Sequence, residues 1–488
     1  MMQRIKNFLF KNTSDKQTVV KNTFWLFLGE VVGRLLKLAL IIYTARVLGA
    51  EGWGVFSYAL SLASLLMVFS DVGITGLITR EIIQKKKDFS VFISTALLAK
   101  TIFLFASTLL VLFAGPFLSH IPEARVLFPL FAIVLFFDAA RDLILAINIA
   151  FEKMEKDMLV KTSMGVITLI LGVILLRIEV APISVAIAYA VGSTVGCVMA
   201  FLIIKKDLKG LFSKSNSRTL RLVLQTTWPF AIVTLIGIIT GATDVYMLGI
   251  WRDPTEIGLY TSAQRIQQFI IIIPIMLGTA VFPLLSRLVN TDNNQFGIVL
   301  EKTLSFVFAM GIPIVCGGIL LSSEIMTFLF GTSYVNAGPL LQMLMVSLLA
   351  SLPLAILSNS IFAHNGQKNI AIAYLSGLGI NILLNIFLIP QYGALGAAFA
   401  TVLSTTIITV IIWSKLKNIQ RFEILPRLKK VFLSTASMII SILLLKQIDL
   451  HVVITILISS FVYIGSLLLL KESILSEARS LLNNKSLV

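Results

Sequence analysis

The stretch LGAEGWGVFSYA, residues 48–59, returns later in the chain as LGIWRDPTEIGLYTSA, residues 248–263. Both copies place glycines between two long apolar segments. Each copy is also preceded by a small-xxx-small pair, GEVVG at 29–33 and GIITG at 237–241. This spacing lets helix backbones approach closely inside a membrane. The sequence therefore predicts two related halves in the same orientation, offset by about 200 residues.

The composition shows what surrounds the chain. Of its 488 residues, 57% are hydrophobic and only 13% are charged, and the mean hydropathy is +0.95. One soluble core cannot bury that much apolar surface, so the excess must face lipid. Fourteen apolar runs are each long enough to cross about 30 Å of hydrocarbon as a helix. They are predicted near 24–48, 54–79, 89–115, 126–150, 158–176, 182–204, 222–250, 257–285, 300–321, 338–362, 370–389, 394–414, 431–447 and 452–470.

The spans and the repeat together predict an all-α polytopic membrane protein with two pseudo-symmetric six-helix bundles and two further C-terminal helices. Two similar bundles that face each other enclose a cavity at the midplane and can rock around it, which predicts an alternating-access transporter. The predicted parts are a cytoplasmic N-terminal tail at 1–21, an N-terminal six-helix bundle at 22–204, a basic cytoplasmic linker at 205–221, a C-terminal six-helix bundle at 222–416, two extra transmembrane helices at 417–470 and a cytoplasmic tail at 471–488.

The positive charge of the chain follows membrane topology. The formal net charge is +16, and basic residues gather in the N-terminal tail, at KKK 85–87 and from Lys205 to Arg221. These segments all lie on one side if the N-terminus is cytoplasmic, as the positive-inside rule expects. We therefore predict a multi-pass protein of the cytoplasmic membrane, with both termini in the cytoplasm, the lipid bilayer as its partner and no nucleic-acid binding.

Three charged residues interrupt the first predicted span. Glu30, Arg34 and Lys37 are spaced i, i+4 and i+7, so they share one helix face. Counted from Lys21 at the cytoplasmic edge, Arg34 lies roughly 20 Å into the bilayer. A charge at this depth costs about 2.5 to 3.5 kcal/mol, which makes Arg34 and Lys37 candidate substrate-binding residues. The alternative is a structural role, in which carboxylates on the same or a neighbouring helix satisfy both cations.

Other intramembrane charges are candidates for pairing, gating or coupling. Arg141 lies between Asp138 and Asp142, a spacing that predicts a local ion pair. Asp244 is either a partner of Arg265 or a gate or coupling-ion site, and Arg265 is a third candidate for substrate binding. A cationic centre favours an anionic ligand, and guanidinium groups suit phosphate oxygens. The carboxylates that are candidates for coupling or gating are Glu30, Asp71, Asp138, Asp142 and Asp244.

The sequence lacks the motifs of catalysis and nucleotide binding. It has no GxxxxGK[ST] loop, no GxSxG and no HExxH, so neither an ATP-driven pump nor a membrane hydrolase is predicted. Cys197 and Cys316 both lie in apolar spans, where a cysteine usually acts as a small hydrophobic residue. We expect a transporter, not an enzyme, without a metal or other cofactor. Its energy would come from an ion gradient such as H⁺ or Na⁺, from membrane potential or from downstream consumption of the product.

Two stretches resemble a known family. The segment from NTFWLFLGEVVGRLLK to SDVGITGLITRE, residues 22–81, is similar to the opening of the polysaccharide repeat-unit flippases. This is the Wzx-type family of the multidrug/oligosaccharidyl-lipid/polysaccharide exporter superfamily. Residues 362–404 are similar to a second characteristic region of that family, with the pattern IP.YG..GAA.AT that includes Pro390, Tyr392 and Gly396.

The resemblance implies a flippase that moves an isoprenoid-diphosphate-linked oligosaccharide, such as an O-antigen repeat unit, from the cytoplasmic to the outer leaflet. Polysaccharide polymerase machinery is an implied partner. Arg34 and Lys37 would then hold the diphosphate or acidic sugars. Two alternatives stay open. A peptidoglycan lipid-precursor flippase differs only in the head group of its substrate, whereas a cation-coupled multidrug exporter of the same superfamily favours an acidic cavity.

Overall fold

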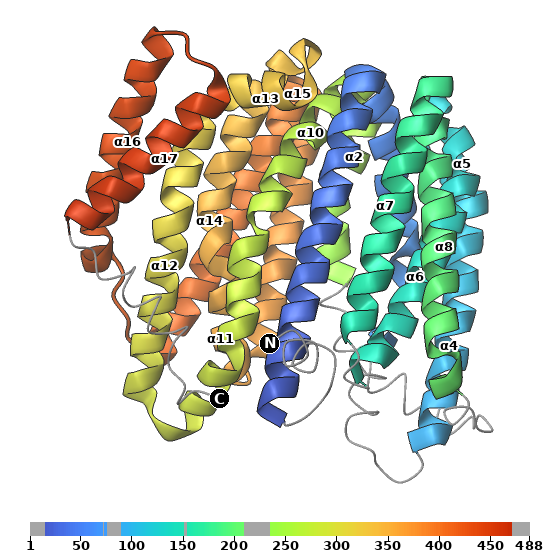
Figure 1. The fold of residues 1–488 in the computed structure, drawn as a ribbon, viewed down its shortest axis with the longest axis horizontal. Helices are drawn as coiled ribbons and strands as arrows, with labels where there is room; N and C mark the ends of the chain where they lie inside the picture. Colours follow the sequence, from blue (N-terminus) through green and yellow to red (C-terminus); the bar gives the residue numbers. More distant parts are fainter. Residues whose placement is uncertain (1–14, 72, 76–88, 151–153, 209–234, 471–488) are drawn as a thin grey trace, which may run out of the picture. The chain divides into compact units, whose positions relative to one another are not determined.

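The described chain is helical throughout. The computed structural model describes residues 15–71, 73–75, 89–150, 154–208 and 235–470, and the regular elements in these ranges are all helices (Figure 1). Within them, nine helical segments are long and apolar enough to cross a membrane. The prediction of an all-α polytopic membrane protein is confirmed at this level.

The chain folds into two compact units, unit 1 up to Gly258 and unit 2 from Leu259 onward. The elements of unit 1 are α2 (Asp15–Leu66), η1 (Met67–Ser70), α4 (Phe89–Leu109), η2 (Leu110–Ala114), α5 (Gly115–Leu118), η3 (Pro122–Leu127), α6 (Phe128–Ala150), α7 (Met154–Ile178), α8 (Pro182–Leu208), the helix Leu235–Trp251 and the start of α10 (Pro254–Ile270). The predicted linker at 205–221 lies mostly outside the described residues, and the predicted domain bounds stay a prediction.

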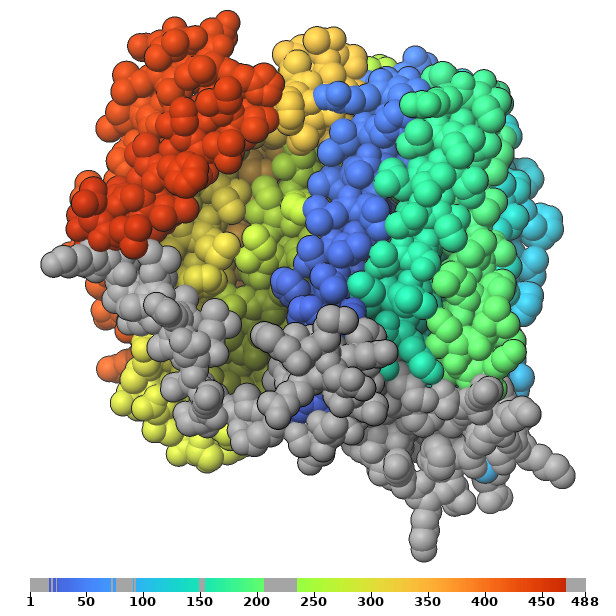
Figure 2. Space-filling view, in the orientation of Figure 1, coloured from blue at the N-terminus to red at the C-terminus, as the bar shows by residue number. Residues whose placement is uncertain are grey.

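Helix α7 packs between α2 and α8 in unit 1. Figure 2 shows these three helices side by side on one face of the unit. Glycines on the facing surfaces allow the approach, because Gly165 and Gly172 of α7 lie against Leu36 and Leu40 of α2. Helix α6 packs against α8 behind them. Close packing through small residues is the usual way in which helices associate in a membrane.

Unit 2 is built around α14 (Gly338–Ala363). Its other elements are α11 (Ile272–Thr291), α12 (Asn293–Leu320), α13 (Ser322–Phe330), η4 (Thr332–Ala337), α15 (Gln367–Ile419), η5 (Leu425–Leu428), α16 (Lys429–Gln447) and α17 (Val452–Leu469). Helix α14 packs against α11, α12 and α15. Helices α16 and α17 pack on each other, and α16 also packs against α12 (Figure 1).

Two helices are too long for a single crossing and are broken at glycines. Helix α2 has 52 residues and a break at Gly49, with φ 69°, and α15 has 53 residues and a break at Gly393, with φ 57°. A continuous helix of that length would extend about 80 Å. In α15 a Cβ at Gly396 would lie 2.4 Å from the Leu388 carbonyl oxygen, so the chain turns back on itself at this point. Both breaks lie where the sequence predicts one span to end and the next to begin.

Large apolar side chains cover the outer surfaces of the helices. Phe117, Phe461 and Phe387 are 88%, 72% and 66% exposed. Water would penalise such surfaces, whereas lipid chains solvate them. The exposed phenylalanines therefore fit a multi-pass membrane protein. Of the fourteen predicted spans, those at 54–79 and 222–250 lie partly outside the described residues.

The two copies of the repeated glycine motif contact each other within unit 1. A Cβ at Gly54 would lie 1.7 Å from the carbonyl oxygen of Pro254, and a Cβ at Gly258 would lie 1.8 Å from that of Ala50. The contacting positions are equivalent in the two copies. Ala50 corresponds to Pro254 and Gly54 corresponds to Gly258, each 204 positions further along the chain. This reciprocal contact is the pattern expected where two related segments meet about a two-fold axis.

We expect Gly54→Ala to destabilise the protein, because the added methyl group overlaps the backbone of Pro254. Overpacking at such a contact typically costs about 1 to 3 kcal/mol. Thermal unfolding of the purified protein in detergent would measure the loss. Gly379→Ala is the matched control, since no atom lies within 4 Å of the Cβ position at Gly379. Equal melting temperatures for the two variants would contradict the close approach.

Candidate functional site

Glu30 on α2 is shared by two cations. The Arg34 Nε donates to Glu30 Oε1 at 2.5 Å, one turn along the same helix. The Lys161 Nζ on α7 lies 3.5 Å from Glu30 Oε2. The structure confirms that Glu30 and Arg34 share a helix face. It also shows that Lys161, from the neighbouring helix α7, is a second cation beside the Glu30 carboxylate.

Arg34 and Lys37 keep accessible side chains. The Arg34 side chain is 45% exposed despite its ion pair with Glu30, and Lys37 is exposed as well. Lys37 also interacts electrostatically with Asp138 of α6. An ion pair that stays this accessible is held weakly compared with a buried one. An anion that reaches Arg34 can therefore compete with Glu30 for its donors.

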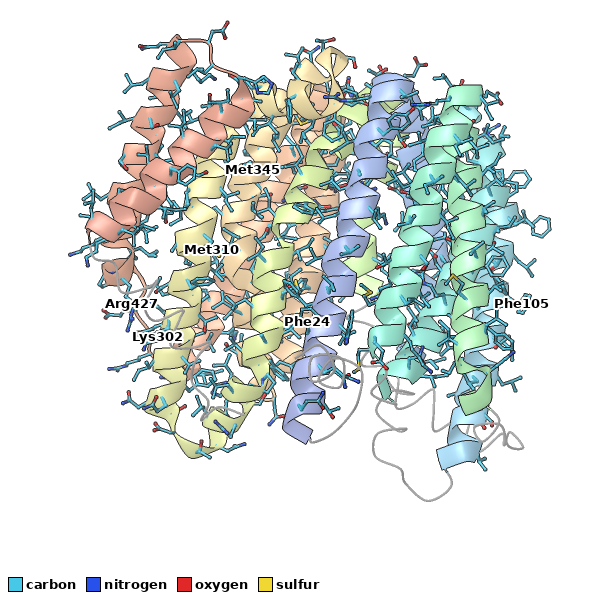
Figure 3. All side chains as sticks on the ribbon, viewed as in Figure 1. Phe24, Phe105, Lys302, Met310, Met345 and Arg427 are labelled. Atoms are coloured by element: carbon cyan, nitrogen blue, oxygen red, sulfur yellow. The ribbon has the colours of Figure 1, made fainter. Side chains whose placement is uncertain are left out.

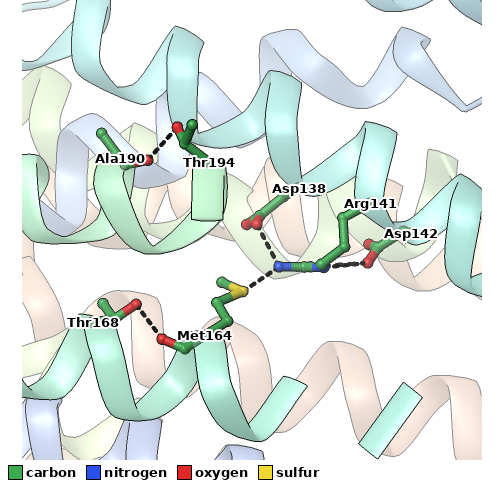
Figure 4. A network of polar contacts seen from close by, with 7 residues as sticks. All are labelled: Asp138, Arg141, Asp142, Met164, Thr168, Ala190 and Thr194. Atoms are coloured by element: carbon green, nitrogen blue, oxygen red, sulfur yellow. Dashed lines mark hydrogen bonds and ion pairs between the residues drawn. The ribbon is translucent and has the colours of Figure 1, made fainter. Parts of the chain in front are cut away.

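Arg141 is enclosed by its neighbours on α6. Its Nη1 donates to Asp138 Oδ1 at 2.7 Å and its Nη2 to Asp142 Oδ1 at 2.9 Å (Figure 4). The sulfur of Met164 on α7 also contacts the guanidinium group. The local ion pair predicted from the spacing is confirmed. Because Arg141 is 9% exposed and its donors are engaged by two carboxylates, it serves to hold α6 together rather than to meet a ligand.

Asp71 follows the end of η1 and pairs with a buried lysine of α4. The Lys100 Nζ lies 3.0 Å from Asp71 Oδ2 and donates to Thr75 Oγ1 at 2.7 Å. The other carboxylate oxygen of Asp71 accepts from the backbone N–H of Thr75 at 3.2 Å. Lys100 is 1% exposed, so its ammonium group depends on these oxygens. The geometry pairs Asp71 with Lys100, a partner that the sequence did not indicate.

Asp244 and Arg265 belong to different compact units. Asp244 is 4% exposed on the helix Leu235–Trp251 of unit 1. Arg265 is half-buried on α10 in unit 2, where its Nη1 donates to Gln268 Oε1 at 2.9 Å. The roles predicted for these two residues stay predictions.

Sequence reasoning missed three charged groups at the start of α7. Helix α7 begins at Met154, whereas the apolar run predicts a span only from 158, so Glu155 and Asp157 fall outside the predicted span and Lys161 falls inside it without an assigned role. In the structure Glu155 pairs with Lys21 of α2 at 3.2 Å, and Lys21 is 2% exposed. The spacing of Asp157 and Lys161, one helical turn apart, is the signal that could have identified them.

Unit 2 contains an apolar cavity of about 450 Å³ between its main bundle and the α16–α17 pair. Figure 3 labels two of its lining residues, Met310 on α12 and Met345 on α14. The few polar groups around it belong to α17, and the Tyr463 hydroxyl among them already donates to the Ala309 carbonyl oxygen at 2.5 Å. A cavity of this kind suits an apolar chain rather than a charged group.

Ion pairs attach the α16–α17 side of this cavity to the rest of unit 2. At one end the Arg427 Nη2 lies 3.1 Å from Glu301 Oε2 of α12. At the other end the Lys446 Nζ lies 2.5 Å from Glu324 Oε1 of α13 and donates to the Leu320 carbonyl oxygen at 2.9 Å. These pairs hold the two ends of α16 while the middle of the helix lines the cavity with Met438 and Ile442.

Metal-ligand chemistry is sparse in the part of the chain that the structure describes. No group of three or more His, Cys, Asp or Glu side chains in these ranges could hold a metal ion. Cys197 on α8 and Cys316 on α12 are free thiols.

Family profiles match both halves of the chain. The profile of the family described as polysaccharide biosynthesis protein matches residues 19–289, and that of the lipid II flippase MurJ matches residues 252–471. A Shigella flexneri protein assigned as an O-antigen transporter is 24% identical over 78% of this chain and 94% of its own length. A Haloferax volcanii protein assigned as the low-salt glycan biosynthesis flippase Agl15 is 23% identical over 80% of this chain and 82% of its own length.

Solved structures show the same fold. A lipid II flippase MurJ in an inward closed conformation aligns with a TM-score of 0.77 and 20% identity, over 90% of this chain and 97% of that one. A multidrug resistance MATE family transporter in an inward-facing conformation aligns with a TM-score of 0.62 and 15% identity, over 80% of this chain and 98% of that one. The described helices therefore have the fold shared by these transporters.

We expect Asp71→Asn to lower the stability of the protein, because it leaves the ammonium group of Lys100 buried without its carboxylate. Breaking a fully buried pair from one side typically costs about 3 to 5 kcal/mol, and the 36% exposure of the Asp71 side chain places the expected loss below that range. Asp142→Asn is the matched control, since the Asp142 side chain is 60% exposed and Arg141 keeps Asp138. Thermal unfolding in detergent separates the two. A melting temperature for Asp71→Asn equal to that of Asp142→Asn would contradict the pairing role.

Proposed function

This chain belongs to the polysaccharide biosynthesis protein family, and from that premise we propose that it is a flippase for an isoprenoid-diphosphate-linked oligosaccharide. It would move this polysaccharide repeat unit from the cytoplasmic to the outer leaflet by alternating access. The observation that carries the proposal is the accessible Arg34 on helix α2, where the sequence predicts a membrane span, within a family whose relatives include assigned glycan and O-antigen transporters.

The head group would bind at Arg34 and Lys37 of unit 1, and Arg265 of unit 2 is kept as a separate candidate contact for substrate. Arg34 and Lys37 are exposed cations on helix α2, and Arg34 offers a planar set of donors that matches phosphate oxygens. The diphosphate is the part of the substrate that every such lipid carries, whereas the sugars differ. A pair of cations at this position fits a ligand with a fixed anionic group.

The apolar cavity of unit 2 would accommodate part of the isoprenoid chain. Its walls are aliphatic side chains and methionines, which adapt to flexible apolar ligands. The α16–α17 pair, which forms one side of it, exposes Phe461 and Leu468 to the lipid phase. The proposed tail site and the outer face of this helix pair are thus both mainly apolar.

The finer architecture proposed from the sequence has fourteen spans. They form the bundles 22–204 and 222–416 with two extra helices at 417–470, and both termini are cytoplasmic. Support comes from the reciprocal contacts of Gly54 with Pro254 and of Gly258 with Ala50, which relate the two halves by one offset. Alternating access by two related bundles follows from that arrangement. Polysaccharide polymerase machinery is the proposed downstream partner.

The proposed coupling carboxylates differ in how they are paired. Asp71 pairs with Lys100, and Asp138 and Asp142 pair with Arg141. Glu30 is shared between Arg34 and Lys161, which leaves it the most directly linked to the proposed head-group site. We propose Glu30 ahead of Asp71, Asp138, Asp142 and Asp244 as the carboxylate whose charge affects substrate binding, with H⁺ or Na⁺ as the coupled ion.

A second candidate function is transport of a peptidoglycan lipid precursor. The specific observation in its favour is the match of residues 252–471 to the lipid II flippase profile. Both substrates would carry a diphosphate and an isoprenoid tail, so the same cations and the same cavity would serve either one. The identity of the lipid that accumulates without the protein separates the two functions.

We expect Arg34→Ala/Lys37→Ala to insert normally and to lose at least about 90% of transport, because two charge-assisted contacts to the diphosphate are removed at about 1.5 to 3 kcal/mol each. The measurement is mass spectrometry of total lipids from cells that lack the protein and carry either the wild type or a variant. A diphosphate-linked oligosaccharide should accumulate on deletion and clear only with the wild type.

Arg177→Ala/Lys205→Ala is the matched control for this experiment. It removes the same charge from unit 1, at exposed positions near the ends of α7 and α8. Lipid clearance by the control but not by Arg34→Ala/Lys37→Ala supports the head-group site. Clearance by both double variants would exclude it, and accumulation of a peptidoglycan precursor instead would favour the second candidate function.

We expect Gly317→Leu to reduce lipid clearance several-fold without loss of folded protein. A Cβ at Gly317 would point into the apolar cavity, with its nearest neighbours Met438 and Ile442 at 3.8 and 3.9 Å, so the larger side chain fills space that the isoprenoid would occupy. Gly465→Leu makes the same change on α17, where no atom lies within 4 Å. Unchanged clearance by a folded Gly317→Leu protein would rule out the cavity as the tail site.

A further inference from the structure

Asp157 is a buried carboxylate without a hydrogen-bond partner among the described residues. It lies in the first turn of α7, is 1% exposed, and neither of its oxygens accepts a hydrogen bond there. Asn148 of α6 is 0% exposed and lies beside it, and the described residues give its amide no hydrogen-bond partner either. Two unpaired polar side chains at full burial are unusual, because buried polar groups are normally hydrogen-bonded.

The charged groups around Asp157 are already engaged elsewhere. On α7 itself, Lys161 lies one turn away and Glu155 two residues away. Lys161 lies 3.5 Å from Glu30 of α2, and Glu155 pairs with Lys21 of the same helix. These are the contacts that α2 contributes next to Asp157 within the described ranges.

The two other helices packed against α7 supply no free cation near Asp157 among the described side chains. On α6, Asp142 is a like charge that pairs with Arg141. Helix α8 packs Ala200 and Ile203 against Val160 of α7, and its Lys205 is exposed. Asp157 therefore lies among the amide of Asn148, apolar side chains and Lys161, a cation that Glu30 already contacts.

A proton is the ligand that this environment favours. An ionised carboxylate that is buried without a partner loses its hydration and gains little in return. A protonated carboxyl group is neutral and has one O–H donor, which the Asn148 carbonyl oxygen can accept. Hard metal cations take about six or more oxygen ligands, whereas Asp157 and Asn148 together offer three.

We propose that Asp157 is a proton-binding site of unit 1 whose occupancy sets the charge of the group Asp157, Lys161, Glu30 and Arg34. With Asp157 ionised, the four side chains sum to zero charge, and both carboxylates compete for Lys161. With the proton bound, the sum is +1, and Lys161 is left to Glu30. Arg34 is then held less strongly by Glu30 and is more available to an anion.

Binding of a proton and of an anion should therefore favour each other. Such linkage is reciprocal, so an anion at Arg34 should also increase proton uptake at Asp157. This last step rests on the proposed function, because it takes Arg34 as the anion contact. The protonation of Asp157 itself does not depend on what the protein transports.

Infrared spectroscopy of the purified full-length protein during a pH titration tests the protonation. A protonated buried carboxyl group gives a carbonyl band distinct from that of ionised carboxylates, and we expect Asp157→Asn to lose this band. Glu179→Gln is the matched control, since it removes an exposed carboxylate beyond the other end of α7 and should keep the band. Retention of the band in Asp157→Asn would overturn the proposal, and so would a band that responds to Na⁺ at constant pH.

Stability and proton uptake give two further readouts. Because the site favours a neutral side chain, Asp157→Asn should melt at or above the temperature of the wild type, whereas a structural ion partner would give a clear decrease. Inorganic pyrophosphate should cause proton uptake by the wild type in weakly buffered detergent solution but not by Asp157→Asn. Uptake that persists in Asp157→Asn would overturn the linkage. The infrared result does not involve a lipid substrate, so a failure of the proposed function would be recognised separately in the lipid analysis.

Discussion

Hydrocarbon provides no hydrogen-bond or ion-pair partner for a charged side chain, and this constraint determines how the charged residues of unit 1 are paired. Each deeply buried cation in its described helices has carboxylates around it: Lys100 has Asp71, Arg141 has Asp138 and Asp142, and Lys21 has Glu155. Lys21 and Glu155 join α2 to α7, Lys100 joins α4 to Asp71 at the end of η1, and the pairs of Arg141 bridge turns within α6. Such pairs add little net stability compared with apolar packing, but removing one partner is costly. The pair of Lys21 with Glu155 therefore helps to hold α2 beside α7, and the pairs of Arg141 stabilise α6 itself.

Accessibility separates the structural cations of unit 1 from the functional candidates. Lys100 is 1% exposed and saturated, whereas the Arg34 side chain is 45% exposed while its carboxylate, Glu30, is divided between two cations. A saturated cation has no donors to offer a ligand. A cation whose partner is shared can exchange that partner for an anion at a lower cost. The difference between the two environments, rather than the presence of charge, is what makes Arg34 the stronger candidate.

The sequence predicts the interactions that are local along the chain and misses those that join distant helices. The spacing of Arg141 with its flanking aspartates predicts their pairing, because both partners lie within one turn. The contact of Lys161 with Glu30 joins α7 to α2 and has no local signal. The start of α7 at Met154 was also missed, since its first turn is polar, and with it the buried Asp157. The cavity around Met310 and Met345 could not be predicted, because residues that line it have the same composition as residues that face lipid.

The repeat relates the two halves of the chain, but the two halves differ in their charged residues. Aligned on their glycine pairs, GEVVGRLLK at 29–37 corresponds to GIITGATDV at 237–245, so Arg34 matches Ala242 and Lys37 matches Val245. The shared spacing does not give shared packing: a Cβ at Gly29 would lie 2.9 Å from the Met158 Cα, whereas among the described residues no atom lies within 4 Å of the Cβ position at Gly33, Gly237 or Gly241. The charges depend on what the helix must meet, and only one half carries a basic stripe. One basic stripe in one half suits a substrate with an anionic head and an apolar tail. A second basic stripe would bind the head group more tightly without improving the fit of the tail.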